Sequence, residues 1–457
     1  MTSPGSRDVV IIGASLAGLF AAAAAATSGS RTMIIERDVL PDSPVARKGV
    51  PQGRQPHVLL HRGLLAAEKL IPGIREDLLS HGAVPFDTGT MAWLGEYGWL
   101  PTWIPAYETV SATRPLLEHL VRKRVRELDG VTLREGVRVT ELQRNDRNWH
   151  VVCDDATIVR ADVVIDASGR GSRLPHWLAE LGVRLADPLT LDAHLGYACR
   201  MYRVIGEPPI GFGVVIQATP ETGRSALAIP VEDGHWLVVA GGYGDLRPTH
   251  DPQEFDQFLA RLPDPAIAEL TQRLDPVGDI AIHRQTGNRR HRYGRSRSWP
   301  AGLLTVGDAY CAFNPVYGQG ITVAACQALL IRDALKHART PLDGGPMETR
   351  RLQRRIGAAA DLPWQVATSE DIRHPGSSGS QTKAQRLVGL WTAQLGRLAA
   401  HGDRPAYVAF ARVYHLMATS AMLFHPAVVF SVCRSAIRGL PEANPRPRAL
   451  QLLTANR

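Results

Sequence analysis

The sequence is poor in cysteine, and its few cysteines form no regular pattern. There are five in 457 residues, widely scattered and without a CxxC pair. This excludes a disulfide framework and a cysteine-based zinc site, because both depend on regular cysteine spacings. We therefore predict no metal site and a reducing, cytoplasmic setting.

Long apolar runs are also missing. The most apolar stretch of the C-terminal half, 421–433, contains histidine and proline and falls short of the ~20 residues that a membrane-spanning helix needs. The first residues lack the charged segment and cleavable apolar core of a secretion signal. We expect a soluble protein without stable membrane insertion.

Lysine is scarce, so the formal charge of +8 comes almost wholly from arginine, and acidic residues are interleaved with it. Such a mixed pattern is weak support for a nucleic-acid partner, and we expect none. The densest basic cluster, 288–297, is predicted to be a solvated loop before a strand.

The N-terminal region has the pattern of a strand, a tight turn and a helix. Residues 8–12 form a short β-branched run that stops at Gly13, and the chain continues as G-A-S-L-A-G into an alanine-rich helix. A dinucleotide-binding turn needs glycine at the turn, a small residue beside the pyrophosphate, and Gly18 for close helix–strand packing. Ser15 stands where the middle glycine is usual; it adds bulk near the phosphates, but its hydroxyl can donate a hydrogen bond to one.

A second strand, 32–36, ends in an acid. Glu36 lies eighteen residues after Gly18, where a carboxylate can accept hydrogen bonds from both ribose hydroxyls of an adenosine. The alternative is an ordinary α/β unit in which the glycine and the acid serve packing alone.

Two basic segments follow. The first, 47–73, begins as a basic, glycine-rich loop and continues as a helix with apolar residues at Leu60, Leu64, Leu65 and Leu70. The second, 111–128, places Arg114 at the start of an amphipathic helix. Its other Arg and Lys residues are predicted to be solvated, opposite a buried stripe of Leu117, Leu120, Val121 and Leu128.

Two later stretches resemble further nucleotide contacts. In 161–178 a β run is closed by Asp166 and a turn of small residues. In 302–335 a strand ends at Gly307, and Asp308 then offers a carboxylate for the hydroxyls of a polyol chain. The N–H groups of 318–320 begin an apolar helix whose dipole favours negative charge.

These motifs carry a family resemblance. GASLAG with Glu36, DASGRGSR and GDAYCAFNPVYGQG occur in the order and spacing of the single-component FAD monooxygenases, the group of para-hydroxybenzoate hydroxylase and squalene epoxidase, which the chain resembles over nearly its whole length. RDVLPDSPVARKGVPQGRQPHVLL, NPVYGQGITVAA and PWQVATSEDIRHPG look most like flavin-dependent epoxidases that act on polyenes in bacterial polyether biosynthesis. The resemblance implies FAD as cofactor, with NAD(P)H and O2 as co-substrates.

The implied fold class is α/β: a Rossmann-like FAD-binding domain of the para-hydroxybenzoate hydroxylase type, an antiparallel-sheet substrate domain and a helical C-terminal region. The FAD-binding domain is assigned to 1–79, 109–186 and 286–340, the substrate domain to 80–108 and 187–285, and the helical region to 341–457. Apolar runs between turn residues in 187–285 predict the antiparallel sheet, and the aromatic segment 80–108 is expected to join this sheet or the pocket. Met and Phe residues near the C-terminus are predicted to pack in a core.

The resemblance also assigns FAD contacts. It places the ADP part on Gly13, Ser15, Gly18 and Glu36, Arg114 near the phosphates or the ribityl chain, and Asp308 on the ribityl–pyrophosphate region. The isoalloxazine is expected beside a loop whose catalytic positions are Pro315, Gly318, Gln319 and Gly320, where helix-start N–H groups stabilise the charge of reduced flavin at N1–C2=O. The full predicted FAD-binding set is Gly13, Ser15, Leu16, Ala17, Gly18, Glu36, Arg37, Arg47, Lys48, Gly49, Val50, Gln52, Arg114, Asp166, Gly169, Gly307, Asp308, Pro315, Gly318, Gly320 and Ile321.

The activity implied by the resemblance is transfer of one oxygen atom from O2, through a hydroperoxide at flavin C4a, to a carbon–carbon double bond of a lipophilic polyketide, polyene or isoprenoid intermediate in antibiotic or related natural-product biosynthesis. Because the cofactor supplies this chemistry, no essential acid or base is expected, and the histidines considered are predicted to be structural or at the surface: His57, His61, His194 and His283.

Three other functions stay open: hydroxylation of an aromatic intermediate, reduction or dehydrogenation of isoprenoid double bonds, and FAD binding for structure or sensing. WIP at 103–105 matches part of a flavin halogenase signature, but the upstream tryptophan spacing does not, so a halogenase is not predicted. The expected partner is a lipophilic small molecule, bound by a monomer or homodimer.

Overall fold

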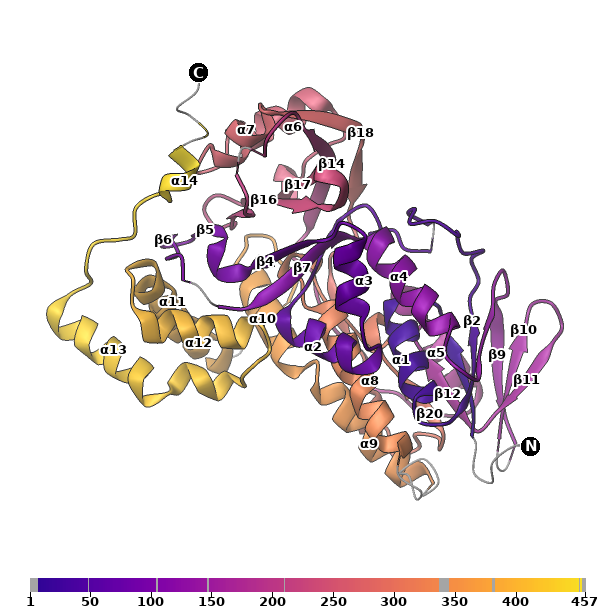
Figure 1. The fold of residues 1–457 in the computed structure, drawn as a ribbon. Coiled ribbons are helices and arrows are strands. Elements are labelled where there is room, and N and C mark those ends of the chain that lie inside the picture. The colour runs from indigo at the N-terminus through magenta and orange to yellow at the C-terminus, as the bar shows by residue number, and fades with distance from the viewer. Residues whose placement is uncertain are drawn as a thin grey trace.

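The computed structural model describes residues 7–47, 49–103, 106–145, 148–208, 210–336, 345–379, 383–451 and 453. The chain forms an α/β fold with a parallel sheet, several antiparallel sheets and a helical C-terminal region (Figure 1). The predicted fold class is confirmed.

The parallel sheet has the strand order β20-β12-β1-β2-β8. Its strands are β1 (Asp8–Ile12), β2 (Arg31–Ile35), β8 (Val131–Arg134), β12 (Val163–Asp166) and β20 (Leu303–Thr305). All four strand pairs are parallel, and the central strands are nearly continuous apolar runs because both faces of the sheet are covered. Strand β2 ends one residue earlier than predicted, so Glu36 lies just beyond its carboxyl end.

Several helices share an apolar core with this sheet. They are α1 (Leu16–Ala26), α2 (His61–Leu70), α3 (Ile74–Ser80), α4 (Arg114–Arg126) and α8 (Gly320–Lys336). The small residues of α1 allow it to contact both β1 and α8 closely. A Cβ added at Gly18 would lie 1.9 Å from the Gly13 carbonyl oxygen, so only glycine allows this approach.

The fold also contains three small sheets of three strands each. The first pairs β3 (Pro56–Leu59), β7 (Glu108–Thr113) and β4 (Val84–Asp87), and the second pairs β9 (Val139–Arg144), β10 (Trp149–Cys153) and β11 (Ile158–Ala161). The third contains β13 (Leu189–Leu191), β19 (Asn288–Arg290) and β21 (Cys311–Ala312). Helix α5 (Leu174–Glu180) follows β12.

The large sheet has seven strands in the order β18-β14-β17-β16-β15-β5-β6. Their bounds are β5 (Ala92–Gly95), β6 (Gly98–Trp99), β14 (Leu195–Val204), β15 (Val214–Ile216), β16 (Arg224–Val231), β17 (His235–Tyr243) and β18 (Leu274–His283). The sheet is antiparallel, as predicted, except where β15 pairs with β5 in parallel. Helices α6 (Pro252–Ala260) and α7 (Ala266–Thr271) share an apolar core with it.

The aromatic segment 80–108 is divided between two sheets. Its strand β4 pairs with β7 of the first small sheet, whereas β5 and β6 extend the large sheet.

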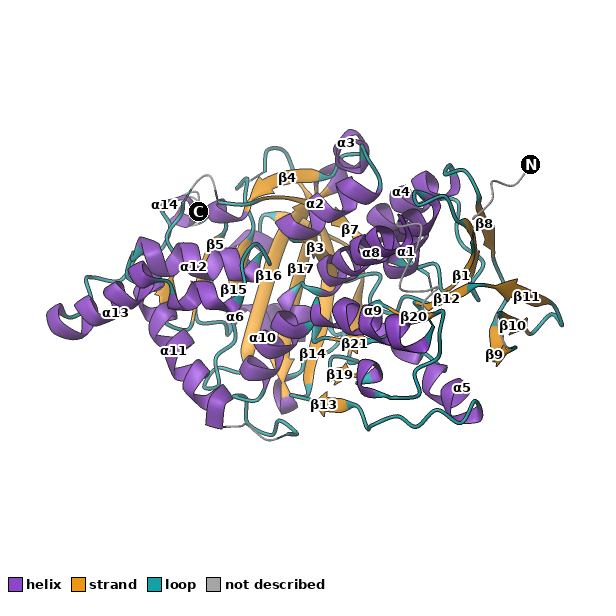
Figure 2. Ribbon diagram, turned by 90° about the horizontal axis from the view of Figure 1, so that it is seen from below, coloured by secondary structure: helices purple, strands orange, loops and turns teal. Residues whose placement is uncertain are grey.

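The chain after 345 is helical. Its helices are α9 (Pro346–Ala358), α10 (Asp361–Asp371), α11 (Lys383–Ala400), α12 (Arg404–Tyr414), α13 (Pro426–Arg438) and α14 (Arg448–Gln451). Figure 2 shows α11–α13 and the parallel sheet at opposite ends of the molecule, with the large sheet between them. The predicted core role of the C-terminal Phe residues is wrong for Phe424 and Phe430, which are 50% and 67% exposed.

Two other expectations need correction. The cluster 288–297 is not a solvated loop, because it begins with β19 and packs Tyr293 against Trp299 in the core. Arg122 is buried and donates to the Pro41 carbonyl, so the basic face of α4 is not wholly solvated.

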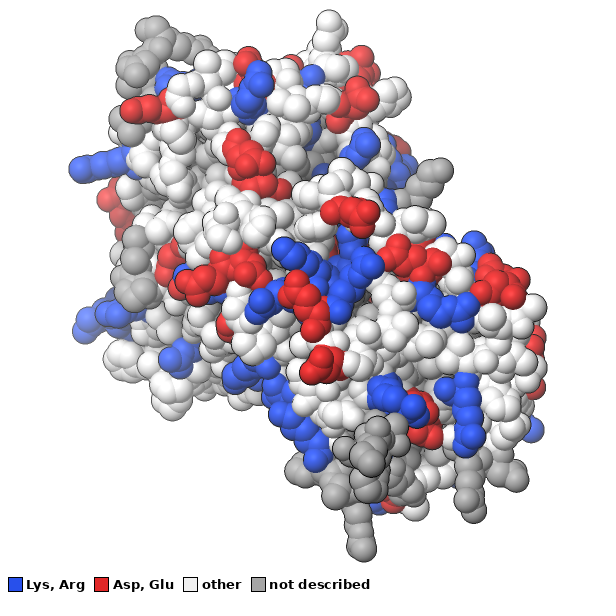
Figure 3. Space-filling model, turned by 45° about the vertical axis from the view of Figure 1, so that its right-hand side comes forward, with Lys and Arg blue, Asp and Glu red and all other residues white. Residues whose placement is uncertain are grey.

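Two global features concern membranes and charge. Within the described parts of the chain, no helix combines the length and hydropathy that crossing a bilayer requires. On the face shown in Figure 3, basic and acidic side chains are interspersed.

Candidate functional site

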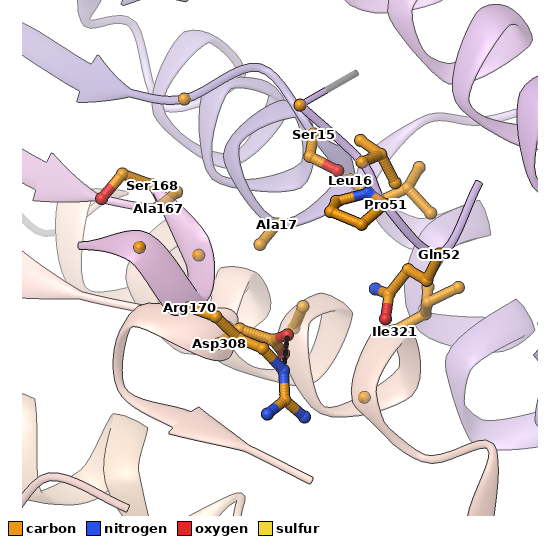
Figure 4. Close-up of a pocket in the computed structure, with 18 of the residues that line it drawn as sticks. Ser15, Leu16, Ala17, Pro51, Gln52, Ala167, Ser168, Arg170, Asp308 and Ile321 are labelled. Carbon is orange, nitrogen blue, oxygen red and sulfur yellow. Dashed lines mark ion pairs between the residues drawn. The ribbon is translucent and has the colours of Figure 1, made fainter. Parts of the chain in front are cut away.

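A cleft of about 490 Å³ opens at the carboxyl ends of the parallel strands. This edge of an open α/β sheet is where ligands bind, because the turns after the strands converge there. The lining comes from the turns after β1, β2, β12 and β20, the loop before β3 and the start of α8 (Figure 4).

Nearly all the predicted FAD-binding and flavin-loop residues line this cleft. They are Gly13, Ser15, Leu16, Ala17, Glu36, Arg37, Arg47, Gly49, Val50, Gln52, Arg114, Gly169, Gly307, Asp308, Pro315, Gly318, Gln319, Gly320 and Ile321. Gly18 does not line it and instead packs against Gly13. Lys48 lies outside the described residues.

Asp166 is also absent from the cleft wall. Its side chain is fully buried and accepts hydrogen bonds from the Ser168 backbone N–H (3.0 Å) and from the hydroxyls of Ser168 and Ser172 (2.5 Å each). Burial raises the pKa of this carboxyl, and the serine donors oppose the rise. Asp166 therefore shapes the turn from behind, which the sequence pattern did not distinguish from a contact with a ligand.

The turn after β1 brings backbone close to the cleft. Gly13 has φ of +102°, and an added Cβ would lie 2.7 Å from the Ala167 carbonyl oxygen. Both facts require glycine. The N-terminus of α1 follows directly, with Leu16 and Ala17 in the cleft wall.

Glu36 is 5% exposed at the end of the cleft beside β2. Its Oε2 accepts a hydrogen bond from the Ala14 N–H (2.7 Å), and its Oε1 accepts one from the Asp38 N–H (3.0 Å). The carboxylate is thus fixed by backbone on both sides, and its remaining lone pairs can accept hydroxyl groups.

A buried ion cluster lies along the same wall. The Arg47 Nε donates to Glu118 Oε1 (2.8 Å), and its Nη1 donates to Asp38 Oδ2 (2.7 Å). Arg114 pairs with Glu118 Oε2 at 3.1 Å. Burial by itself raises the pKa of Glu118, but Arg114 and Arg47 outweigh burial and hold that pKa below its usual value. Sequence reasoning missed Glu118, although its position four residues after Arg114 on one helix is a usable signal.

Asp308 lies beside Arg170 in the cleft (Figure 4), with Arg170 Nε 3.6 Å from Asp308 Oδ2. Arg170 is fixed by donating to the carbonyls of Gly287 (2.7 Å) and Phe313 (2.6 Å). Burial raises the pKa of Asp308, and Arg170 and Arg114 oppose the rise. Arg170 lies within the DASGRGSR motif, but its role was not predicted.

The loop before α8 is held from behind by a buried acid. Asp371, 1% exposed, accepts from Asn288 Nδ2 (2.6 Å), Asn314 Nδ2 (3.0 and 3.1 Å) and the Tyr317 hydroxyl (2.8 Å). Asn314 in turn caps the turn 315–317, and Gly318 then takes φ of +64°. Burial raises the pKa of Asp371 to about 6. The sequence PWQVATSEDIRHPG contained this residue without revealing its partners.

Two histidines also line the cleft. The Nδ1 of His57 lies 2.8 Å from the Gln55 carbonyl, which requires a proton on Nδ1 and leaves Nε2 as an acceptor. Desolvation and the charge of Arg114 lower the pKa of His57 to about 3. His283 points Nε2 at the Gln285 carbonyl (3.2 Å), and burial lowers its pKa as well. His61 and His194 lie outside the cleft.

Several buried polar atoms of the cleft have no hydrogen-bond partner among the described residues: Gln55 Oε1, Gln319 Oε1, Arg47 Nη2 and Arg170 Nε. Such atoms are costly unless a ligand or water completes them. Two arginine donors suit phosphate or ribityl oxygens, and the open backbone N–H groups of two helix starts suit anionic groups. The donor set fits a dinucleotide such as FAD. Among the described residues, no group of three or more His, Cys, Asp or Glu could hold a metal ion.

Comparison with protein-family models agrees with this fit. One model described as FAD dependent oxidoreductase matches residues 8–180, and a second with the same description matches 107–331. Protein Rv3254 of Mycobacterium tuberculosis is 33% identical over 356 residues, which cover 73% of this chain and 74% of that protein. This chain belongs to the FAD-dependent oxidoreductases.

Solved structures share its fold at low sequence identity. A flavoprotein/dehydrogenase from Cytophaga hutchinsonii has a TM-score of 0.66 at 15% identity, covering 93% of this chain and 96% of that one. PqsL from Pseudomonas aeruginosa has a TM-score of 0.60 at 18% identity, covering 80% and 97%. The α/β FAD-binding fold is thus like that of PqsL and other flavin monooxygenases.

Proposed function

We propose that this FAD-dependent oxidoreductase is an NAD(P)H- and O2-dependent monooxygenase that epoxidises a carbon–carbon double bond of a lipophilic natural-product intermediate. Bound FAD supplies the redox chemistry, accepting a hydride and activating O2 so that one oxygen atom can be transferred. The protein must then bind and orient the cofactor, exclude water and control protons near the reacting atoms.

The donors and acceptors of the cleft support one placement of FAD. Glu36, fixed by two backbone N–H groups, accepts the ribose hydroxyls of the adenosine. The N-terminus of α1 and Arg114 would hold the pyrophosphate, and Asp308 and Arg170 would bind the ribityl chain. Residues 315–320 would hold the isoalloxazine, and the start of α8 would stabilise negative charge on the ring.

The state of the cleft histidines supports an alkene as the acceptor of oxygen. A general base works best when its pKa is near the working pH, and His57, with a pKa of about 3, is a poor proton acceptor at pH 7. Burial lowers the pKa of His283 in the same direction. An alkene takes an oxygen atom without losing a proton to the protein, whereas a phenol gains reactivity from deprotonation. Because His57 and His283 are neutral and weakly basic, they suit the epoxidation of an alkene better than the deprotonation of a phenol.

Labelled oxygen tests this proposal. The protein is incubated with NAD(P)H, 18O2 and a polyene, and we expect a product heavier by one labelled oxygen and lacking one double bond, as read by mass spectrometry and NMR. Equal turnover without O2 would contradict it and would favour a reductase or dehydrogenase. Label found in a phenol would favour the second candidate.

That second candidate is hydroxylation of an aromatic intermediate. It rests on the second ring nitrogen of each cleft histidine, His57 Nε2 and His283 Nδ1, which can accept a phenol hydrogen bond. His57→Ala separates the two activities because alanine offers no acceptor, with His61→Ala outside the cleft as the matched control. A phenol hydroxylase should lose about 100-fold or more in kcat through His57→Ala alone. An epoxidase should keep its rate within a few-fold in both variants.

A further inference from the structure

Ser15 is the N-cap residue of α1, but its side chain does not cap the helix. Serine at this position normally accepts a hydrogen bond from the N–H of the second or third helical residue. The side chain of Ser15 makes no such bond. Its hydroxyl turns instead to α4, accepting from Arg114 Nη2 at 2.6 Å and donating to Glu118 Oε2 at 3.0 Å.

This orientation decides what the helix N-terminus offers to the cleft. A capping hydroxyl would use an N–H group that a phosphate needs and would place an oxygen lone pair where the anion should lie. Glycine at the middle position of a dinucleotide-binding turn avoids this conflict because it has no side chain. Ser15 stands at that position, and Leu16 and Ala17 next to it line the cleft.

Glu118 is built to hold the hydroxyl in place. It is 5% exposed, and its two oxygens have separate tasks: Oε1 accepts from Arg47 Nε, and Oε2 accepts from Ser15 and Arg114. The single hydroxyl hydrogen of Ser15 is committed to this carboxylate. The two arginines also offset a negative charge that would otherwise repel an anionic ligand.

We propose that Glu118, together with Arg114, holds the Ser15 hydroxyl away from the N-terminus of α1, so that a turn with serine in place of the middle glycine can still receive the pyrophosphate of FAD. Glu118 is then a positioning residue, and its importance for FAD binding depends on the presence of Ser15. The inference rests on the placement of the pyrophosphate proposed above.

A double-mutant cycle tests this dependence directly. Glu118→Gln is the informative change because an amide has one acceptor oxygen where the carboxylate has two. If that oxygen keeps Arg47, the amide N–H faces Ser15 and the serine hydrogen loses its acceptor. The dissociation constant of FAD from the apoprotein is measured by quenching of flavin fluorescence for wild type, Ser15→Gly, Glu118→Gln and the double variant.

We expect Glu118→Gln to weaken FAD binding about tenfold in the presence of Ser15 and about twofold in the Ser15→Gly background, a coupling of about fivefold. Asp38→Asn is the matched control, since Asp38 also binds Arg47 but has no bond to Ser15. Its effect should be the same in both backgrounds within about twofold.

The outcomes separate this inference from the placement of FAD. Equal losses from Glu118→Gln in both backgrounds would overturn the role given to Glu118 and leave the pyrophosphate site standing. No change in FAD affinity in any variant that touches Ser15 or Glu118 would overturn both.

A second variant leaves Glu118 intact. Ser15→Asn introduces a strong capping side chain, and we expect it to raise the melting temperature of the apoprotein while weakening FAD binding about tenfold. Unchanged FAD affinity despite the raised melting temperature would overturn the inference, because a capped helix start would then be compatible with the pyrophosphate.

Discussion

Asp371→Asn should change how the stability of the protein depends on pH. Asp371 is a buried carboxylate whose bonding partners are the neutral groups of Asn288, Asn314 and Tyr317. No ion pair with Asp371 occurs among the described residues. Burial of its negative charge therefore destabilises the folded protein. The neutral amide of Asp371→Asn avoids this destabilisation.

The sign and size follow from the pKa of this group. Burial raises the pKa of Asp371 from 3.8 to about 6. A raised pKa means that the folded state binds the proton more tightly, so the stabilising contribution is complete below pH 3.8 and is lost as the pH rises through 6. At about 1.4 kcal/mol for each pH unit, the loss amounts to ~3 kcal/mol between pH 4 and pH 7.

The amide of the variant does not titrate, so its unfolding free energy lacks this decline. The amide does place an NH2 group, with two N–H donors, beside the donors of Asn288, Asn314 and Tyr317, at a cost of about 1–3 kcal/mol that is independent of pH. Consequently, the unfolding free energy of Asp371→Asn minus that of wild type should rise by ~3 kcal/mol from pH 4 to pH 7, whatever its value at pH 4.

Urea unfolding followed by circular dichroism at several pH values, with excess FAD throughout, measures this difference. Glu370→Gln is the control, because Glu370 is the neighbouring acid of α10, pairs with Arg373 and keeps 32% of its side chain exposed. It should keep most of the pH dependence of wild type, because burial is the largest cause of the raised pKa of Asp371 and the charge of Glu370 is a smaller one. A constant difference between Asp371→Asn and wild type across this pH range would refute the reasoning.

Three other predictions concern the cofactor and its turn. The purified protein should be yellow, and denaturation should release flavin that comigrates with FAD; a colourless protein that cannot be reconstituted would contradict the assignment of the cleft. Glu36→Ala and Asp308→Ala should each weaken FAD binding by ~1.5–3 kcal/mol in a fluorescence titration, because each removes a charge-assisted hydrogen bond. Gly18→Ala should sharply lower stability and FAD occupancy, since its Cβ would lie 1.9 Å from the Gly13 oxygen, whereas Gly389→Ala, also within a helix but with open space around its Cβ, should have little effect.

The sequence by itself determined the elements and turns of the FAD-binding region. Gly13, Gly18 and Glu36 act within one strand–turn–helix–strand unit, where spacing along the chain fixes which atoms meet. The turn at Gly307 and the helix start at Gly320 were predictable for the same reason, because short-range backbone geometry dictates which residues these positions accept.

Burial was harder to predict where periodicity was ambiguous. Tyr293 lies in a basic cluster that reads as solvated, yet its ring is 1% exposed. Phe430 reads as core, yet it is 67% exposed. A local pattern gives the character of a segment, whereas burial depends on which other segment covers it.

Only the tertiary structure determined which side chains form hydrogen bonds and ion pairs with one another. Glu118 meets Ser15 from 103 positions away, and Asp371 meets Asn288 from 83 positions away. The sequence equally left open that Asp166 points behind its turn while Asp308 points into the cleft. Hydrogen bonds and ion pairs form over about 3 Å between atoms brought together by the packing of whole sheets and helices, so spacing along the chain carries no signal for them.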